Sequence, residues 1–218
     1  MKRVVAIHTT PATIPGIKDI CTNMIKNCEV VSMLDDSMLP EINREGYIPE
    51  DVKYRFFSMI MMAASTKPDA IICACSSIGG LIDSGRCITD VPLFRIDEPM
   101  AAEAVERGSK IGVAATLAST INPTKELIIR KARESGKEIS LECRVIEGAG
   151  RLLSEGRMDE YDEIIASNLK ELLLNNDVVA LAQASMARAV SIMDEKLKCK
   201  VLTSPESGVK AMSKFLGE

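Results

Sequence analysis

Short apolar runs alternate with longer amphipathic stretches along the whole chain. Eight apolar runs predict β-strands at 3–8, 29–33, 69–75, 92–96, 110–116, 141–146, 177–183 and 200–204. The stretches between them predict helices, of which the clearest cover 49–65, 123–135, 159–174 and 208–217. Hydrophobic strands that alternate with helices are typical of a parallel sheet covered on both faces. We therefore predict an α/β fold.

The helix after the strand at 110–116 carries end signals of its own. Asn122 is the predicted N-cap, Pro123 the first helical residue and Gly136 the stop. Proline suits the first turn of a helix because the N–H that it lacks would have no partner there. We therefore expect this helix to begin at Pro123.

An internal duplication predicts the domain organisation. Three pairs of segments match at a common spacing of about 107 or 108 residues: 5–13 with 113–120, 69–77 with 177–185, and 92–96 with 200–204. We predict two pseudo-symmetric Rossmann-like lobes, 1–97 and 98–205, each a mostly parallel four-stranded sheet flanked by helices. The C-terminal helix, 206–218, is expected to pack back on the first lobe.

The duplication also predicts where a ligand binds. Ligands of open α/β sheets bind at the carboxyl ends of the strands. Cys75 and Gln183 occupy matched positions just at those ends in the two repeats. We expect them on opposite walls of one cleft between the lobes.

Bulk composition narrows the classes of function. The 218 residues have a net charge of −4, and aromatic residues make up 3% with no tryptophan. Such a surface is unsuited to nucleic acid, so we expect no nucleic-acid partner. The longest nearly apolar run, 70–82, contains two serines and is too short to cross a bilayer, so we expect no membrane partner. Residues 1–10 predict a first strand rather than a signal peptide.

The cysteines and the histidine limit the possible sites. Seven cysteines at irregular spacing indicate reduced thiols and a cytoplasmic protein. Cys73 and Cys75 have no further ligands at metal-binding spacing, so we expect no metal site. His8 is the single histidine, which excludes a zinc site built from several histidines.

The run "IICACSSIGG" at 71–80 raises the main chemical question. Cys75 ends a predicted strand, and Ser76 or Ser77 is the predicted N-cap of the helix that follows. A helix N-terminus binds carboxylates and lowers a thiol pKa from about 8.5 toward neutrality, which makes Cys75 a candidate base or nucleophile. The alternative is a small core thiol, the interpretation that we give to Cys73.

Polar groups at the other strand ends complete the candidate site. The residues assigned to substrate binding are Thr9, Thr10, Ser76, Ser77, Thr116, Thr120, Gln183 and Ser185. Each hydroxyl has the alternative role of a helix cap. Gly79 and Gly80 allow a close approach of the backbone. Asp97 is either an orienting carboxylate or a solvated loop charge, and Arg188 either contacts an anion or forms an exposed ion pair.

Several motifs resemble the cofactor-independent aspartate/glutamate/hydantoin racemase superfamily. They are "CSSIGG" after a strand, "IGVAATLAST", "LAQASMA" and "VLTSPESGV", with "IHTTP" and "LDDSML" in support. The resemblance covers nearly the whole chain. It implies two Rossmann-like lobes and two cysteines that face each other across the substrate Cα. One cysteine removes a proton and the other returns one, without pyridoxal phosphate or any other cofactor.

The chain departs from this pattern at one of the two cysteines. Cys75 matches the first, whereas Gln183 stands where these racemases carry the second. An amide cannot donate or accept a proton near neutral pH, so Gln183 is expected to hydrogen-bond or polarise the substrate. Racemisation by two thiols is therefore not expected of this chain.

Three interpretations remain open, each with a small carboxylate, an amino acid or a dicarboxylate, as partner. In the first, Cys75 is the single thiol of an isomerase that acts next to a carboxylate, or of a decarboxylase or cis–trans isomerase of a dicarboxylate. In the second, racemisation continues with His8 as the second acid, because its pKa is expected near neutrality. In the third, the chain binds a dicarboxylate without catalysis. A homo-oligomer is compatible with all three.

Overall fold

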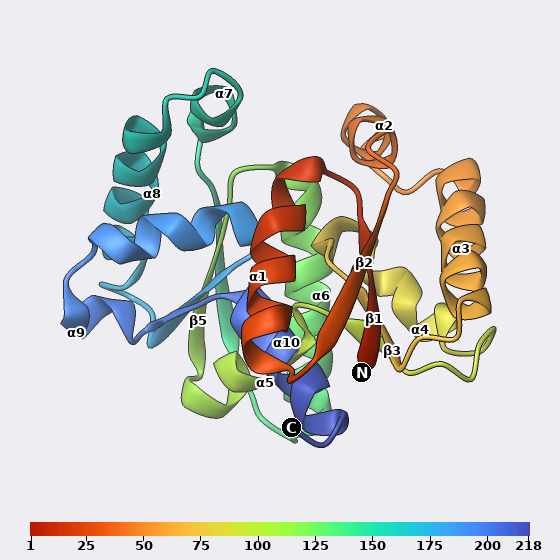
Figure 1. The fold of residues 1–218 in the computed structure, drawn as a ribbon. Coiled ribbons are helices and arrows are strands. Elements are labelled where there is room, and N and C mark those ends of the chain that lie inside the picture. Colours follow the sequence, from red (N-terminus) through yellow and green to blue (C-terminus); the bar gives the residue numbers. More distant parts are fainter. The chain divides into compact units, whose positions relative to one another are not determined.

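The computed structural model describes residues 1–218 as two four-stranded sheets flanked by helices (Figure 1). Every strand pair in both sheets is parallel, so the predicted α/β fold class is confirmed. All eight predicted strands are present. The chain divides into two compact units: unit 1 comprises Met1–Glu98 and Pro205–Glu218, and unit 2 comprises Pro99–Ser204.

Unit 1 is built on a sheet with the strand order β2-β1-β3-β4. Its strands are β1 (Lys2–His8), β2 (Cys28–Leu34), β3 (Ala70–Cys73) and β4 (Leu93–Arg95). Its helices are α1 (Ile14–Met24), α2 (Met38–Glu45), α3 (Glu50–Ser65), α4 (Ile82–Gly85), α10 (Ser204–Phe215) and the short 3-10 helices η1 (Pro11–Thr13) and η2 (Ser76–Leu81).

Helices bury both faces of the unit 1 sheet. Alternate residues of β1 point to opposite faces: Val4 and Ala6 pack with α1 and α10, whereas Val5 and Ile7 pack with α2 and α3. Figure 1 shows α1 and α3 on opposite sides of β1 and β2. A strand that is covered on both faces must be apolar throughout, which is why the unbroken run at 3–8 predicts it well.

Unit 2 repeats this sheet with the strand order β6-β5-β7-β8. Its strands are β5 (Lys110–Ala115), β6 (Ser140–Val145), β7 (Val178–Leu181) and β8 (Val201–Leu202). Its helices are α5 (Glu98–Arg107), α6 (Ala118–Glu134), α7 (Ala149–Ser154), α8 (Met158–Leu172), α9 (Glu195–Lys198) and the 3-10 helix η3 (Ala184–Ile192).

In each unit, one of the packed helices follows the last strand of the other repeat. In unit 2, α5 and α6 pack on the face of Ile111 and Val113, and α7, α8 and η3 pack on the opposite face. Helix α5 follows β4 of unit 1 but packs on the unit 2 sheet, while α10 follows β8 of unit 2 but packs on the unit 1 sheet. The two repeats therefore exchange equivalent helices.

The predicted start of helix α6 is wrong. The helix begins at Ala118 with Leu117 as its N-cap residue, and Pro123 lies inside it. Its buried stripe begins with Thr120 and Thr124, two polar residues that a hydrophobic pattern does not count. Packing against the sheet extends the helix N-terminally beyond the proline signal, because tertiary contacts override local preference.

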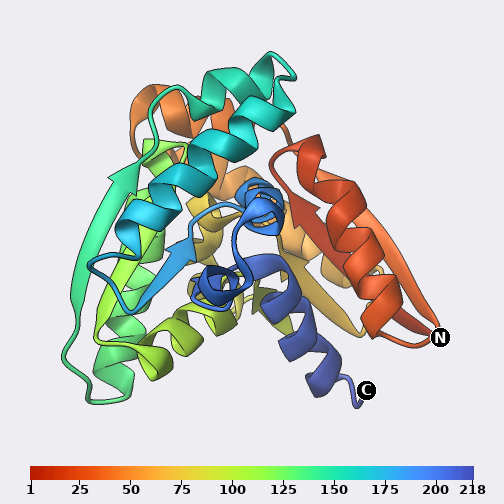
Figure 2. The ribbon, with the colours of Figure 1, turned by 90° about the vertical axis from the view of Figure 1, so that its left-hand side faces the viewer.

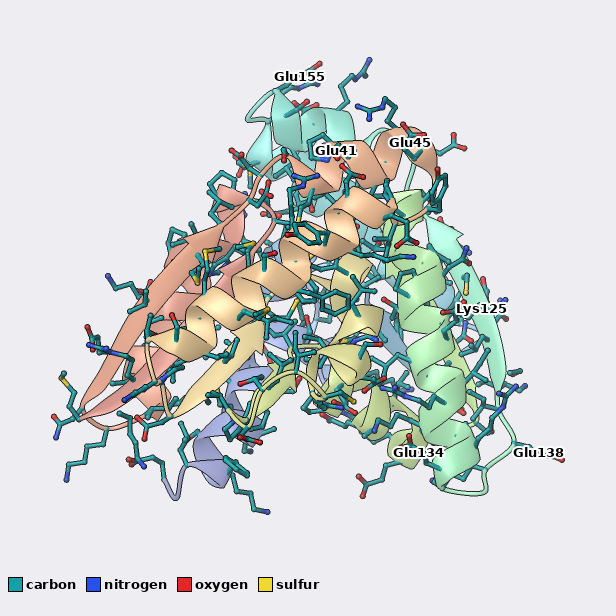
Figure 3. The ribbon with its side chains drawn as sticks, turned by 90° about the vertical axis from the view of Figure 1, so that its right-hand side faces the viewer. Glu41, Glu45, Lys125, Glu134, Glu138 and Glu155 are labelled. Carbon is teal, nitrogen blue, oxygen red and sulfur yellow. The ribbon has the colours of Figure 1, made fainter.

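Charged side chains cover the outer helix faces of both units. Figure 3 shows Glu41 and Glu45 on α2 of unit 1, and Lys125 and Glu134 on α6 of unit 2. None of the helices combines the length and the apolar content that crossing a membrane requires.

Candidate active site

Cys75 lies two residues beyond β3, where the chain turns into η2. It is the N-cap residue of η2, its backbone is extended at φ −138° and ψ 116°, and the residue is 9% exposed. Helix η2 begins at Ser76 and has no side-chain cap, so the prediction that Ser76 or Ser77 caps it is wrong. The serines belong to the first turn because the helix starts directly after the thiol.

Four donors converge on the Cys75 sulfur, and we call them the Cys75 donor cluster. They are the Thr9 hydroxyl, the Ser77 hydroxyl, and the backbone N–H groups of Ser77 and Ile78. Both hydroxyls are buried and make no hydrogen bond in this structure. Each can donate to a Cys75 thiolate. The cluster is therefore built to stabilise a thiolate.

Burial nevertheless determines the direction in which the pKa of the Cys75 thiol shifts. Loss of solvent raises the pKa of Cys75, and the donors from Thr9, Ser77 and Ile78 lower it by less. The expected pKa near neutrality is therefore wrong, because the sequence does not reveal how deeply the thiol is enclosed. Cys73 is fully buried, burial raises its pKa, and it packs in the unit 1 core as predicted.

Gln183 holds the corresponding place beyond β7 in unit 2, as the N-cap residue of η3. Its amide oxygen accepts three hydrogen bonds: from the Thr116 N–H at 2.6 Å, the Thr116 hydroxyl at 3.0 Å and the Leu117 N–H at 3.1 Å. We call these three groups the Gln183 donor cluster. They orient the amide and leave its NH2 group as the part available to a ligand.

The strand registers show how closely the two places correspond. Ile7 pairs with Cys73 in unit 1, and Ala114 pairs with Leu181 in unit 2. Two residues further along each strand pair, Thr9 meets Cys75 and Thr116 meets Gln183. A threonine hydroxyl is thus aimed at the matched position in both repeats.

Comparison with known proteins decides the family. The sequence pattern described as Asp/Glu/Hydantoin racemase matches residues 3–212. The chain belongs to the Asp/Glu/hydantoin racemase family. Members of this family are isomerases that need no pyridoxal phosphate. No curated protein matches the chain.

Solved structures of racemases share the fold of this family member at low sequence identity. A glutamate racemase of Bacillus anthracis matches with a TM-score of 0.77 and 14% identity, covering 99% of this chain and 82% of that one. An aspartate racemase of Picrophilus torridus matches with 0.72 and 18%, covering 100% and 95%. An allantoin racemase of Klebsiella pneumoniae matches with 0.71 and 16%, covering 100% and 88%.

The alternation of β1 directs the His8 side chain away from the core in which Cys75 packs. His8 follows Val4 and Ala6 on the α1 side of the sheet, whereas Cys75 packs in the core on the α3 side. Burial lowers the pKa of His8 to about 4, so the expected pKa near neutrality is wrong. At neutral pH the imidazole is uncharged and has no proton to spare as an acid.

The hydrogen bonds of Thr13 favour one tautomer of His8. The Thr13 hydroxyl donates to the Thr10 carbonyl at 3.2 Å, so it accepts from Nδ1 of His8 at 2.8 Å. Nε2 is then a bare acceptor, fully buried and without a partner. His8 of this racemase-family protein is thus uncharged at neutral pH.

Asp97 belongs to a buried ion pair and is not a solvated loop charge. Its carboxylate accepts from Nε of Arg95 at 2.5 Å and from a terminal nitrogen at 3.0 Å. Gly79 lies directly on this guanidinium, because a Cβ atom there would be 2.5 Å from Nε of Arg95. A Cβ atom on Gly80 would meet nothing within 4 Å. Of the two glycines, Gly79 makes the close approach.

The remaining predicted residues divide between capping and the site. Thr10 caps η1 by accepting from the Ala12 N–H, and the Thr120 hydroxyl donates to the Leu117 carbonyl at 2.8 Å. Thr10 therefore takes the alternative role of a helix cap, whereas Thr120 lies in the first turn of α6 and does not cap it. Ser76 is buried in the first turn of η2. Arg188 forms an ion pair with Asp162 at 2.6 Å. The predicted exposed ion pair is correct for the Arg188 side chain, which is exposed, but the Asp162 side chain is buried.

Sequence reasoning missed one polar residue at the unit 2 strand ends. Tyr161 on α8 is 0% exposed, and its hydroxyl donates to the Ser185 hydroxyl at 3.3 Å and also contacts Thr116. In the sequence it counts as one apolar position of an amphipathic helix. The sequence does contain one signal for it: a tyrosine on the buried face of a helix must place its hydroxyl near a hydrogen-bond partner.

Proposed function

We propose that this racemase-family protein is a cofactor-independent isomerase of a small carboxylic acid. Cys75 acts as its single thiol base or nucleophile at the carbon next to the carboxylate. The observation that carries the proposal is the Cys75 donor cluster, in which two otherwise unpartnered hydroxyls and two N–H groups favour the thiolate. A thiol that served only as packing would gain nothing from such donors.

The proposal assigns no proton transfer to position 183. An amide holds no titratable proton near pH 7, so Gln183 is assigned to substrate binding, together with Thr9, Ser77, Thr116 and Ser185. His8 is not assigned the second proton, since its lowered pKa leaves it neutral. That Cys75 and Gln183 face each other across one cleft stays a prediction of the sequence.

An amide rather than a second thiol at position 183 favours a second candidate function, one that needs a single thiol. A single thiol can add to an unsaturated dicarboxylate and leave again after a bond rotation, or it can protonate a carbanion formed by decarboxylation. A cis–trans isomerase or a decarboxylase of a dicarboxylate needs only one such group. All seven cysteines are free, which fits a reducing compartment such as the cytoplasm.

The test is proton exchange in heavy water. Single enantiomers of aspartate and glutamate, and maleate, are incubated with the protein and followed by proton NMR and polarimetry. We expect solvent deuterium at the carbon next to a carboxylate, and a loss of roughly 10²- to 10⁴-fold in Cys75→Ala, the usual contribution of an acid–base group. Conversion of maleate without exchange would favour the second candidate.

Cys73→Ala is the matched control, because Cys73 lies two residues away and packs in the same core. It is expected to keep the exchange activity while losing a similar amount of side-chain volume. If the wild type binds small dicarboxylates but neither exchanges nor converts any of them, the protein is a binding protein and the proposal is wrong.

A further inference from the structure

The orientation of the Gln183 amide is fixed by its surroundings. Its oxygen receives the three donors of the Gln183 donor cluster, from Thr116 and Leu117. A flipped amide would place an NH2 group against two N–H groups and a hydroxyl, which cannot all accept. The oxygen therefore faces the strand ends of unit 2, and its lone pairs are used up.

The other end of the amide has no partner in the protein. Nε2 of Gln183 makes no hydrogen bond, although the residue is half-buried. The side chain consequently offers two N–H donors and no free acceptor. Such a group binds a carboxylate or carbonyl oxygen well and offers nothing to an ammonium group.

Tyr161 ties this arrangement to the rest of unit 2. Helix α8 lies beside η3 in both views (Figures 1 and 2), and their side chains share one apolar core. From α8 the Tyr161 hydroxyl reaches Ser185, two residues after Gln183, and Thr116, the donor of two bonds to the amide. One phenol thus touches both elements that hold Gln183.

We propose that Tyr161 is a positioning residue that holds Thr116 and Ser185 so that Gln183 presents only donors. The unit 2 strand ends would then select an acceptor group of the substrate, such as a carboxylate oxygen, and reject an ammonium group. The proposal deepens the proposed function and rests on it for the identity of the ligand as a substrate.

The orientation is tested without any substrate by Gln183→Glu. One carboxylate oxygen replaces the amide oxygen and accepts from the same three donors, which favours its charged form. We expect the pKa of the introduced carboxyl, followed by carbon NMR, to lie at least about one unit below the usual 4.3 or so. A pKa at or above the usual value overturns the proposal.

The role of Tyr161 is tested in the same background. Tyr161→Phe keeps the ring in the core and removes the hydroxyl, so at least half of the pKa shift should disappear. Ser185→Ala removes one partner of the phenol without touching the core and should reduce the shift by a smaller amount. If both double variants fold and keep the full shift, Tyr161 does not position Gln183.

Selectivity is tested with two ligands of similar length in ¹⁵N-labelled protein. The side-chain NH2 signals of Gln183 are assigned by their absence in Gln183→Met. Succinate, which has acceptors at both ends, should shift them, and diaminobutane, which has ammonium groups at both ends, should not. Equal shifts, or none with succinate, overturn the selectivity. The carboxyl pKa and the NH2 signals can both be measured without turnover. A failure of these tests can therefore be distinguished from a failure of the heavy-water exchange experiment.

Discussion

In unit 1 the central strand β3 leads to a thiol, whereas in unit 2 the matched strand β7 leads to an amide. Both residues are N-cap residues of a 3-10 helix, and both have a threonine hydroxyl against them, Thr9 in one unit and Thr116 in the other. The hydrogen-bond donors around the two residues also differ in whether they have a partner. Those of unit 2 are occupied by the amide oxygen, while the hydroxyls of unit 1 have no partner.

This difference shows what the repeated scaffold contributes and what the residue contributes. The scaffold supplies donors at the carboxyl end of the sheet in each unit. The side chain placed among them decides the chemistry, because a thiol can release a proton there and an amide can only be oriented. The two repeats thus share this geometry and place chemically different side chains in it.

His8 gives the largest expected effect among the tests of this comparison, since the matched residue in unit 2 is Ala115. Burial lowers the pKa of His8 to about 4, so the unfolded chain takes up a proton near pH 6.5 and the folded chain does not. Stability present above pH 6.5 is therefore lost as the pH falls toward 4, by up to about 3 kcal/mol. Urea unfolding between pH 7 and about 4 measures it.

The single histidine makes the pKa directly visible in the proton NMR spectrum. His8→Asn should remove the pH dependence assigned to this residue and leave heavy-water exchange at pH 7 within a few-fold of wild type. A His8 resonance that titrates near 6.5, together with lost exchange in the asparagine variant, would return His8 to the role of second acid.

Gly79 gives the next largest effect, and unit 2 again supplies the contrast. The strand registers match Gly79 with Ala187 and Arg95 with Thr203, so unit 2 tolerates a Cβ where it has no guanidinium. Gly79→Ala would place its Cβ against Nε of Arg95 and should lower the free energy of unfolding by about 1–3 kcal/mol.

Gly80→Ala is the matched control, because a Cβ there meets nothing within 4 Å. Its free energy of unfolding should stay within about 0.5 kcal/mol of wild type. In an Arg95→Met background, where the guanidinium is absent, Gly79→Ala should cost less than it does in the wild type. Equal effects of the two alanine variants would show that the buried ion pair does not require a glycine.

The apolar strands were predictable from the sequence, and the environment of each polar atom was not. Unbroken runs such as 3–8 identify strands that are buried on both faces. Strand ends were less certain: β3 stops at Cys73 and β7 at Leu181, each two residues before the predicted end. The ladder ends there because the next residues turn into η2 and η3.

For the candidate site, too, the positions of the residues were predictable from the sequence and their environments were not. The duplication marks positions 75 and 183 without any structure, since matched residues must lie at matched strand ends. The pKa shifts of Cys75 and His8 follow from enclosure by segments distant in sequence, which no local pattern reports. Tyr161 was hidden for a related reason, because helical periodicity counts a ring as apolar and ignores its hydroxyl.

Thr9 gives the smallest expected effect on stability, and it tests the donor clusters themselves. Its hydroxyl makes no hydrogen bond in this structure and can donate to a thiolate, so Thr9→Val should change stability little and raise the pKa of Cys75 further. A hydrogen bond to a charged group contributes about 1.5–3 kcal/mol, which corresponds to roughly one to two pH units. Cysteine ¹³Cβ signals measure the shift, with Cys75 assigned by its loss in Cys75→Ala.

Thr10→Val is the control that separates this effect from a general disturbance of the loop. Thr10 caps η1 and does not donate to the sulfur, so its loss should cost about 1 kcal/mol of stability and leave the pKa of Cys75 unchanged. Because the exchange rate rises with the thiolate fraction below that pKa, Thr9→Val should also move the pH profile of exchange upward by the same interval. Equal pKa shifts in the two variants would mean that the hydroxyl aimed at Cys75 contributes nothing specific. The parallel between Thr9 and Thr116 would then be one of shape alone.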